Sequence, residues 1–222
     1  MNIVFLLYDG FTALDVAGPY EILSRLPDAK VQFVAKHKGI IESDNKFLKI
    51  SADFSIDEIK EADVLIIPGS TVSFLEMVLD KTVLNWIKRV YEKSIWTASV
   101  SSGSVILAAT GILDGKKITS HWYTERILEN YNVTFVRKRF VKEGKIITSA
   151  GVTAGIDMAF YLAEKIAGLQ FAESMQLMVE YAPEPPFESG TPDKADEDTL
   201  YFAQKRLKED AIRLRRFSML GI

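Results

Sequence analysis

The chain has 222 residues, of which 48% are hydrophobic and 26% are charged, the proportions of a globular protein with a sizeable core. Its formal net charge of −3 provides no basic field for nucleic acid. Because the chain has no cysteine and only two histidines, His37 and His121, disulfides and thiolate metal sites are excluded and zinc binding is not expected.

No apolar run reaches the length of about 18 residues that a membrane-spanning helix needs. Residues 1–4 begin a strand pattern without the basic region of a signal peptide. The sequence therefore predicts a cytoplasmic protein that does not contact membranes. No G-x-G-x-x-G pattern follows the first strand and no Walker sequence is present, so no cofactor is expected.

The first half of the chain alternates between buried-strand and helix patterns. Residues 3–7 are a continuous apolar run closed by a turn at Gly10, which is typical of a buried strand. Residues 12–26 predict a helix that breaks near Gly18 and Pro19, because proline does not fit inside a helix. Further elements are predicted as strands over 31–35, 64–67 and 95–100, an exposed hairpin over 40–54, and a helix over 83–91 with Asp80 as its N-cap.

The second half continues this alternation with a short strand over 117–120 and a short helix over 123–130. Residues 133–141 and 145–149 predict two strands that pair as a hairpin across Gly144. Two helices follow between residues 151 and 181 and are expected to pack on the sheet. The repeating βα order predicts an α/β protein whose parallel, doubly wound sheet carries helices on both faces.

The end of the chain differs in composition from the rest. Residues 183–198 are rich in proline and acidic residues, which predicts an exposed arm or linker. Residues 200–217 predict a helix with one apolar side, formed by Leu200, Ala203, Leu207, Ala211 and Leu214. The other sides of this helix carry lysines and arginines. Basic helices with one apolar side usually pack on their own domain, and partner or membrane binding is the rarer role. We therefore expect a domain over residues 1–182 and an appendage over 183–222.

The junction at residues 95–104 is the most informative part of the chain. A strand pattern stops there and a helix pattern begins at Ser104, which places Ser101 over a helix N-terminus that favours negative charge. The spacing approaches the nucleophile elbow G-x-S-x-G, with Ser99 in the place of the first glycine. This predicts a nucleophile or an anion-binding residue. The alternative is that Ser101 only caps the helix, a role for which serine is well suited.

Five segments in this order resemble the ThiJ/PfpI superfamily and, within it, the isonitrile-hydratase branch, which is also similar to the N-terminal domains of some AraC-type regulators. They are YDGFTALDVAGPYE (8–21), PGS (68–70), ASVSSGS (98–104), TSHW (119–122) and GVTAGID (151–157). The resemblance covers about residues 1–182 and implies a flavodoxin-like three-layer sandwich, the fold of class I glutamine amidotransferases, in a homodimer. AraC-type regulators add a helix-turn-helix domain of about a hundred residues, which the forty or so residues after Tyr181 do not provide.

The resemblance implies a reactive cysteine at the elbow, where this chain has Ser101. A helix N-terminus that stabilises a thiolate cannot by itself ionise a serine hydroxyl, so Ser101 would need a base. His121 occupies the place where the superfamily has a histidine near its nucleophile, and it is the candidate base. A structural hydrogen-bonding role is its alternative. A further interpretation of Ser101 is an engineered replacement of the family cysteine.

Asp15 corresponds to the acid that the isonitrile-hydratase branch uses to move a proton beside the nucleophile. Spacing alone favours a capping box from Thr12 to Asp15, whereas the resemblance favours catalysis. The backbone N–H groups of Gly69 and Ser102 are interpreted as donors to an oxyanion, with the hydroxyls of Ser70 and Ser102 as supplements. Gly69 has an ordinary turn as its alternative role.

These residues predict an isonitrile-hydratase-like hydro-lyase that acts on a small polarised molecule. In this hypothesis Ser101 adds to a polarised carbon, Asp15 transfers protons, and the amides of Gly69 and Ser102 stabilise developing charge. The first alternative is a catalytically silent binding or sensor protein that keeps the same pocket. The second is a serine hydrolase or amidase that uses Ser101 and His121.

Overall fold

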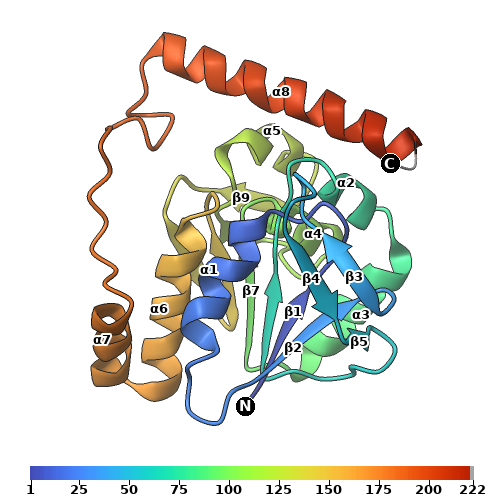
Figure 1. Cartoon of the computed structure of the whole chain (residues 1–222), viewed down its shortest axis with the longest axis vertical. Coiled ribbons are helices and arrows are strands. Elements are labelled where there is room, and N and C mark those ends of the chain that lie inside the picture. Colours follow the sequence, from blue (N-terminus) through green and yellow to red (C-terminus); the bar gives the residue numbers. More distant parts are fainter. Residues whose placement is uncertain (221–222) are drawn as a thin grey trace.

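The computed structural model describes residues 1–220, with side chains up to residue 213. Within this range the core is a seven-stranded sheet in the order β10-β11-β7-β6-β1-β2-β5 (Figure 1), in which only the β10–β11 pair is antiparallel. Its strands are β1 (Asn2–Leu6), β2 (Lys30–Ala35), β5 (Phe54–Ser55), β6 (Val64–Ile67), β7 (Trp96–Val100), β10 (Phe140–Glu143) and β11 (Ile146–Ser149). The predicted mostly parallel, doubly wound sheet is confirmed.

Helices cover both faces of this sheet. On one side α1 (Ala13–Leu23), α6 (Ala154–Ala167) and α7 (Leu169–Met178) pack together. On the other side lie α2 (Phe74–Met77), α3 (Lys81–Lys93), α4 (Gly103–Ala109), the 3-10 turn η1 (Trp122–Thr124) and α5 (Glu125–Leu128). The three layers correspond to the flavodoxin-like sandwich that the sequence predicts.

The central strands are buried because helices cover them on both sides. Every residue of β6 and residues 3–6 of β1 are at most 1% exposed, which explains why these strands appear in the sequence as continuous apolar runs. Because the parallel strands all end at the same edge of the sheet, the loops after β1, β6 and β7 meet there. This edge holds the candidate site.

Two small sheets lie beside the main one. In the first, β3 (Gly39–Glu42) and β4 (Lys49–Ala52) form the predicted hairpin. In the second, β8 (Lys116–Ile118) pairs in parallel with β9 (Val133–Phe135). The single strand predicted over 133–141 is therefore wrong, because its first part leaves the hairpin to pair with β8 and only β10 pairs with β11 across Gly144.

The predicted break in the first helix is also wrong. Pro19 lies inside a continuous α1, although proline removes a backbone donor there. Packing against α6 compensates: an added Cβ at Gly18 would lie 2.9 Å from Ile156, and one at Gly155 would lie 3.2 Å from the Pro19 ring. The helical conformation of α1 at Pro19 is therefore determined by close packing against α6 and not by local helix propensity.

The last helix is α8 (Glu197–Leu220), and an extended segment connects it to α7. Helix α8 crosses the carboxyl edge of the sheet (Figure 1). Its range contains the predicted helix over 200–217, but the side chains from Leu214 onward lie outside those described. Within residues 1–220, every helix is too short or too polar to cross a membrane.

Candidate active site

Ser101 occupies a strained turn between β7 and α4. Its φ of +56° lies in the left-handed region, which non-glycine residues rarely adopt. The surrounding backbone holds it there: the Ser101 amide donates to the carbonyls of Ser149 (3.1 Å) and Ala150 (2.9 Å), and its carbonyl accepts from the hydroxyls of Ser104 (3.1 Å) and Ser120 (2.9 Å). Strain maintained by so many contacts is typical of functional sites.

The Ser101 hydroxyl does not cap α4. Ser102 is the N-cap residue, and its side chain makes no capping bond either. The capping interpretation of Ser101 is therefore wrong: α4 begins one residue later, and Ser101 lines a cavity instead. Among the residues with described side chains, none makes a hydrogen bond with this hydroxyl.

Asp15 lies on α1 beside the loop that follows β6. The side chain is fully buried, its Oδ2 accepts a 2.8 Å hydrogen bond from the Gly69 amide, and its Oδ1 has no partner among the described residues. Burial raises the pKa of the Asp15 carboxyl to about 7, with the Gly69 hydrogen bond lowering it and the charge of Asp44 raising it. A carboxyl with such a pKa can both give and accept a proton near neutral pH.

The capping box predicted from Thr12 to Asp15 is not formed. Thr12 is the N-cap residue of α1, but its side chain makes no capping bond. Its hydroxyl donates instead to Oδ2 of Asp44 at 3.1 Å, and the hydroxyl of Thr71 donates to the same oxygen at 3.1 Å. The carboxyl of Asp15 is thereby left to contact the Gly69 amide and not its own helix start.

Gly69 and Ser70 have different roles from those predicted. The Gly69 amide holds Asp15, and the Ser70 amide donates to the Ser102 hydroxyl at 2.8 Å, which in turn donates to the Ser70 carbonyl. The Ser70 hydroxyl accepts from the Phe74 amide at the start of α2. The Gly69 and Ser70 amides thus bond to side chains, whereas the Ser102 amide has no acceptor among the described residues. Of the predicted oxyanion donors, Ser102 is therefore the one that is available.

Gly69 must be glycine for a steric reason. A Cβ at this position would lie 2.6 Å from both the amide nitrogen and the hydroxyl of Ser102, and 2.9 Å from Oδ2 of Asp15. Distances this short force the neighbours to move. Because residue 69 has no side chain, both Asp15 and Ser102 can lie against its backbone.

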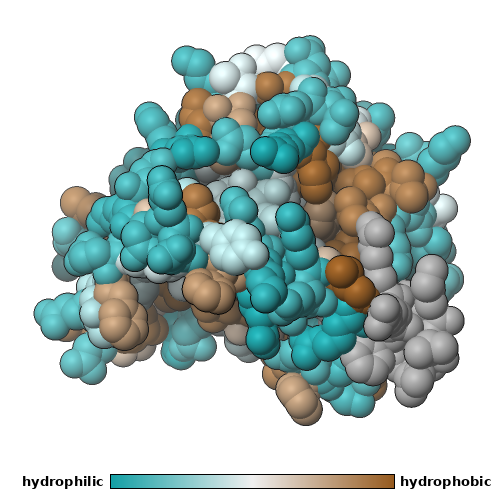
Figure 2. All heavy atoms as spheres, turned by 90° about the horizontal axis from the view of Figure 1, so that it is seen from above, coloured by the Kyte–Doolittle hydropathy of each residue, from teal (hydrophilic) through white to brown (hydrophobic). Residues whose placement is uncertain are grey.

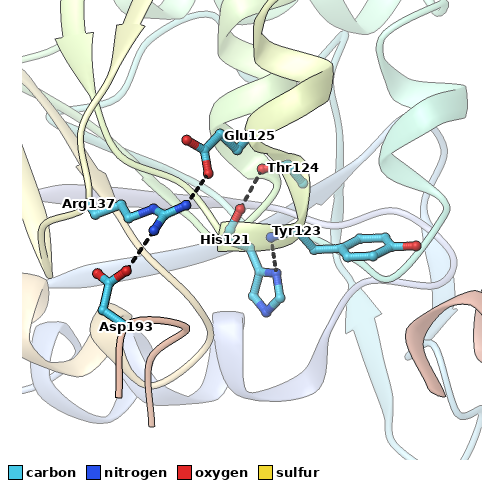
Figure 3. Close-up of polar contacts among 6 residues, drawn as sticks. All are labelled: His121, Tyr123, Thr124, Glu125, Arg137 and Asp193. Carbon is cyan, nitrogen blue, oxygen red and sulfur yellow. Dashed lines mark hydrogen bonds and ion pairs between the residues drawn. The ribbon is translucent and has the colours of Figure 1, made fainter. Parts of the chain in front are cut away.

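His121 lines the same cavity as Ser101, at the start of η1. Its Nδ1 accepts a 3.2 Å hydrogen bond from the Tyr123 amide, and its carbonyl accepts from the Thr124 hydroxyl (Figure 3). Burial lowers the pKa of the imidazole to about 4. Because Nδ1 is an acceptor, the neutral ring carries its proton on Nε2 and has no lone pair there for the Ser101 proton.

The cavity lined by Ser101, Ser102 and His121 has a volume of about 140 Å³, and its described lining residues do not include Asp15. Its wall is polar at Ser101, Ser102, Thr12, Thr71 and Asp44 and apolar at Phe74, Val152 and Leu207. None of the described residues that line it is a lysine or an arginine. With one carboxylate in the wall and no cation, this cavity favours a neutral molecule over an anion.

Several of these residues carry no signal in the sequence. Asp44 lies in the loop of an exposed hairpin and reaches the site only because the loop bonds back to Phe11. Ser120 lies in the segment TSHW (119–122), and its hydroxyl donates to the Ser101 carbonyl, but spacing alone does not predict this role. Leu207 was expected on an apolar helix face, and nothing in that periodicity indicates which surface the face covers.

Comparisons with known proteins place the chain among its relatives. An isonitrile hydratase from Pseudomonas putida is 35% identical over 206 residues, which cover 93% of this chain and 90% of the relative. The crystal structure of a ThiJ/PfpI family protein from Pseudomonas syringae is 32% identical, with a TM-score of 0.89 over 96% of this chain and 88% of that chain. The HTH-type transcriptional regulator CdhR from Pseudomonas aeruginosa is 27% identical over 127 residues, 56% of this chain and 37% of the regulator. Since the DJ-1/PfpI family model matches residues 1–165, the chain belongs to the DJ-1/PfpI family.

Proposed function

We propose that this protein is an isonitrile-hydratase-like hydro-lyase that adds water to the terminal carbon of a small, neutral isonitrile and releases an N-substituted formamide. Ser101 is the nucleophile, Asp15 transfers protons and the Ser102 amide stabilises developing charge. The identity of 35% to an isonitrile hydratase over most of both chains supports the reaction class.

The observation that carries this proposal is the state of Asp15. An acid that is fully buried, has a pKa of about 7 and keeps one oxygen without a partner among the described residues is costly for the fold. Such perturbed groups concentrate at sites of proton transfer. If Asp15 served only to accept the hydrogen bond from the Gly69 amide through Oδ2, its Oδ1 would not need to be buried away from water.

The chemistry of the cavity fits the substrate class. An isonitrile is uncharged, and the lining residues provide no cation for an anionic substrate. The apolar lining residues Phe74, Val152 and Leu207 can contact the nitrogen substituent, and the reactive carbon would bind at Ser101 and Ser102.

The reaction takes two additions. The Ser101 oxygen bonds to the terminal carbon, Asp15 delivers a proton to that carbon and receives the serine proton, and an imidate ester forms. Water then adds to the same carbon. One of its protons ends on the nitrogen and the other returns to the Ser101 oxygen as the carbon–Ser101 bond breaks and the formamide is released. Asp15 gains and loses a proton in each half, which requires a pKa near the working pH.

The test is conversion of ethyl isonitrile to its formamide by the purified protein and by three variants. We expect Asp15→Asn to lower kcat/KM by about 100-fold or more, the effect of losing a general acid–base group. Ser101→Cys should raise turnover, because a thiol ionises more readily than a hydroxyl. Glu21→Gln, an exposed acid on the same helix, serves as the control. Absence of formamide with both the parent and Ser101→Cys would overturn the proposal.

A silent binding protein is the second candidate, and the state of Ser101 favours it. No described side chain bonds to its hydroxyl, and the Nδ1 of His121 is already engaged. The regulator CdhR shows that a part of this family occurs in transcription factors. Retention of an isonitrile or formamide by the parent, measured by calorimetry without turnover, would support this candidate.

The serine hydrolase alternative has weaker support. Its histidine would need a free ring nitrogen and a pKa near neutrality, whereas burial lowers the pKa of His121 to about 4. Labelling of Ser101 by a fluorophosphonate probe would revive this alternative. We further expect the protein to act as a cytoplasmic homodimer, which size-exclusion chromatography and cell fractionation would test.

A further inference from the structure

Helix α8 reaches the catalytic cavity from outside the sandwich. Leu207 lines the same cavity as Ser101, Ser102 and His121, although about a hundred residues separate it from the elbow in the sequence. In Figure 1 the helix crosses the edge at which the parallel strands end. One apolar side chain of α8 therefore forms part of the wall over the nucleophile.

Few polar contacts hold α8 against the rest of the protein. Among its described side chains, the ion pairs of Lys205, Arg206 and Arg213 all join partners on the helix itself. A cavity of about 550 Å³ separates α8 from η1 and α5, with Gln204 and Lys208 on its helix side. Seen from above, hydrophilic residues cover most of this face and hydrophobic ones appear in separate patches (Figure 2). The helix thus rests over the site without being tightly packed into it.

Among the described residues, one ion pair joins the segment before α8 to the body, and Arg137 provides it. Arg137 binds Asp193 of this segment at 2.7 Å and Glu125 of α5 at 3.0 Å (Figure 3). Both ion pairs are about half exposed, so each contributes little to stability and weakens with salt. The other ion pair of the segment, between Lys194 and Glu188, stays within it.

We propose that α8 is a movable cover of the catalytic cavity, and that Leu207 determines how large a molecule reaches Ser101. With the cover closed, the cavity holds only about 140 Å³, which suits a compact ligand. Larger nitrogen substituents require α8 to move, and Arg137 restrains that movement through Asp193. This proposal concerns access to the site and does not depend on which reaction occurs there.

The absence of cysteine from the chain provides a direct test. Ser101→Cys introduces a single thiol at the bottom of the cavity, and its alkylation by small iodoacetamide and bulky N-phenylmaleimide is followed by mass spectrometry. The same thiolate attacks both reagents, so a change in the thiol pKa affects both rates. The ratio of the two rates therefore reports access to the thiol. No turnover is needed, so this test can fail or succeed independently of the hydratase assay.

In the Ser101→Cys background, Leu207→Ala should raise the ratio of bulky to small reagent about fivefold, which corresponds to weakening closure by about 1 kcal/mol. Leu207→Trp should lower the ratio. Leu177→Ala, the same truncation at an 81% exposed position on α7, should leave it unchanged. An unaltered ratio in both Leu207 variants would overturn the proposal, and circular dichroism confirms that each variant is folded.

The restraint by Arg137 is tested in the same background. Asp193→Asn removes one charge from the Arg137 contact and should raise the ratio about twofold, within the range for an exposed ion pair. Glu188→Gln, which breaks only the pair inside the segment, should not change it. Equal effects of the two substitutions would show that Arg137 does not restrain α8.

Discussion

The Gly69 amide donates a 2.8 Å hydrogen bond to Oδ2 of Asp15, while the other oxygen of this carboxyl is buried without a partner in the described chain. Burial and the hydrogen bond act on the pKa in opposite directions, and burial prevails, so the value is about 7. The folded protein therefore keeps a proton on Asp15 that the unfolded chain loses at a much lower pH. This makes folding stability depend on pH.

The first prediction is that this dependence disappears in Asp15→Asn. The folded pKa of Asp15 lies above the ordinary aspartate value of 3.8, so its contribution is fully present below about pH 4 and is lost as pH rises to about 7. We expect the free energy of unfolding of the variant, relative to the parent, to rise over this range by at most about 4 kcal/mol. Urea denaturation at several pH values measures it. A constant difference would show that Asp15 is ionised in the folded state.

The second prediction concerns His121, whose titration makes folding stability depend on pH in the direction opposite to that of Asp15. Its folded pKa of about 4 lies below the ordinary value of 6.5, so its stabilising contribution is present above pH 6.5 and is lost as pH falls towards 4. His121→Asn keeps an acceptor for the Tyr123 amide and removes this titration. Relative to the parent, the variant should become more stable as pH falls. His37→Asn provides the control at a histidine outside the cavity, and an equal slope in both variants would contradict the prediction.

The fold could largely be predicted because its central strands are buried on both faces. Such strands appear as apolar runs in the sequence, and their order fixes the doubly wound topology. Pro19 and residues 133–141 were predicted wrongly for one reason: packing between distant segments decided them. The partner of Pro19 is α6, and the partner of β9 is β8.

The site was predictable only in part. The strand-to-helix turn gives Ser101 a signal in the sequence, and the family resemblance singles out Asp15 and His121. The sequence could not show which backbone amide is available to a ligand. The Gly69 amide, which was predicted to face a ligand, donates to Asp15 instead. Asp44 and Leu207 were inaccessible for another reason, since a hairpin loop and a distant helix bring them to the cavity through tertiary contacts alone.

The third prediction is that Gly69→Ala damages stability and activity together. The new methyl group would lie 2.6 Å from Ser102 and 2.9 Å from Asp15, so both must shift, at a cost of about 1–3 kcal/mol typical of overpacking. Thermal unfolding and formamide production measure the two effects. Gly190→Ala, where nothing lies within 4 Å of an added Cβ, should change neither. Normal behaviour of Gly69→Ala would mean that the approach of Asp15 to the elbow is looser than described.

The fourth prediction separates strain from chemistry at Ser101. Both Ser101→Gly and Ser101→Ala remove the hydroxyl, but only glycine adopts a φ of +56° without cost. After allowing for the greater freedom of glycine in the unfolded chain, we expect the glycine variant to be more stable than the alanine variant by about 1 kcal/mol. Both should lack activity. Equal melting temperatures would indicate that the elbow is not strained.

The fifth prediction is that the charge of Asp44 adds to the effect of burial on the pKa of Asp15. The charge of Asp44 raises the pKa of Asp15, and Asp44→Asn keeps an acceptor for the hydroxyls of Thr12 and Thr71 while removing that charge. The Asp15 pKa should therefore fall. Because proton delivery needs the protonated acid, the alkaline loss of kcat/KM should begin at a lower pH than in the parent.

Profiles from about pH 5 to about pH 9 measure this shift in the Asp44→Asn variant. Asp53→Asn is the matched control, since Asp53 follows β4 of the same hairpin and, within the part of the chain that the structure describes, accepts only from the exposed Ser51 hydroxyl. Removing the cavity carboxylate should also weaken the rejection of anions, so formate should inhibit Asp44→Asn more strongly than the parent. A shift of the profile towards higher pH would mean that Asp44 acts on the substrate directly and not through the charge it places near Asp15.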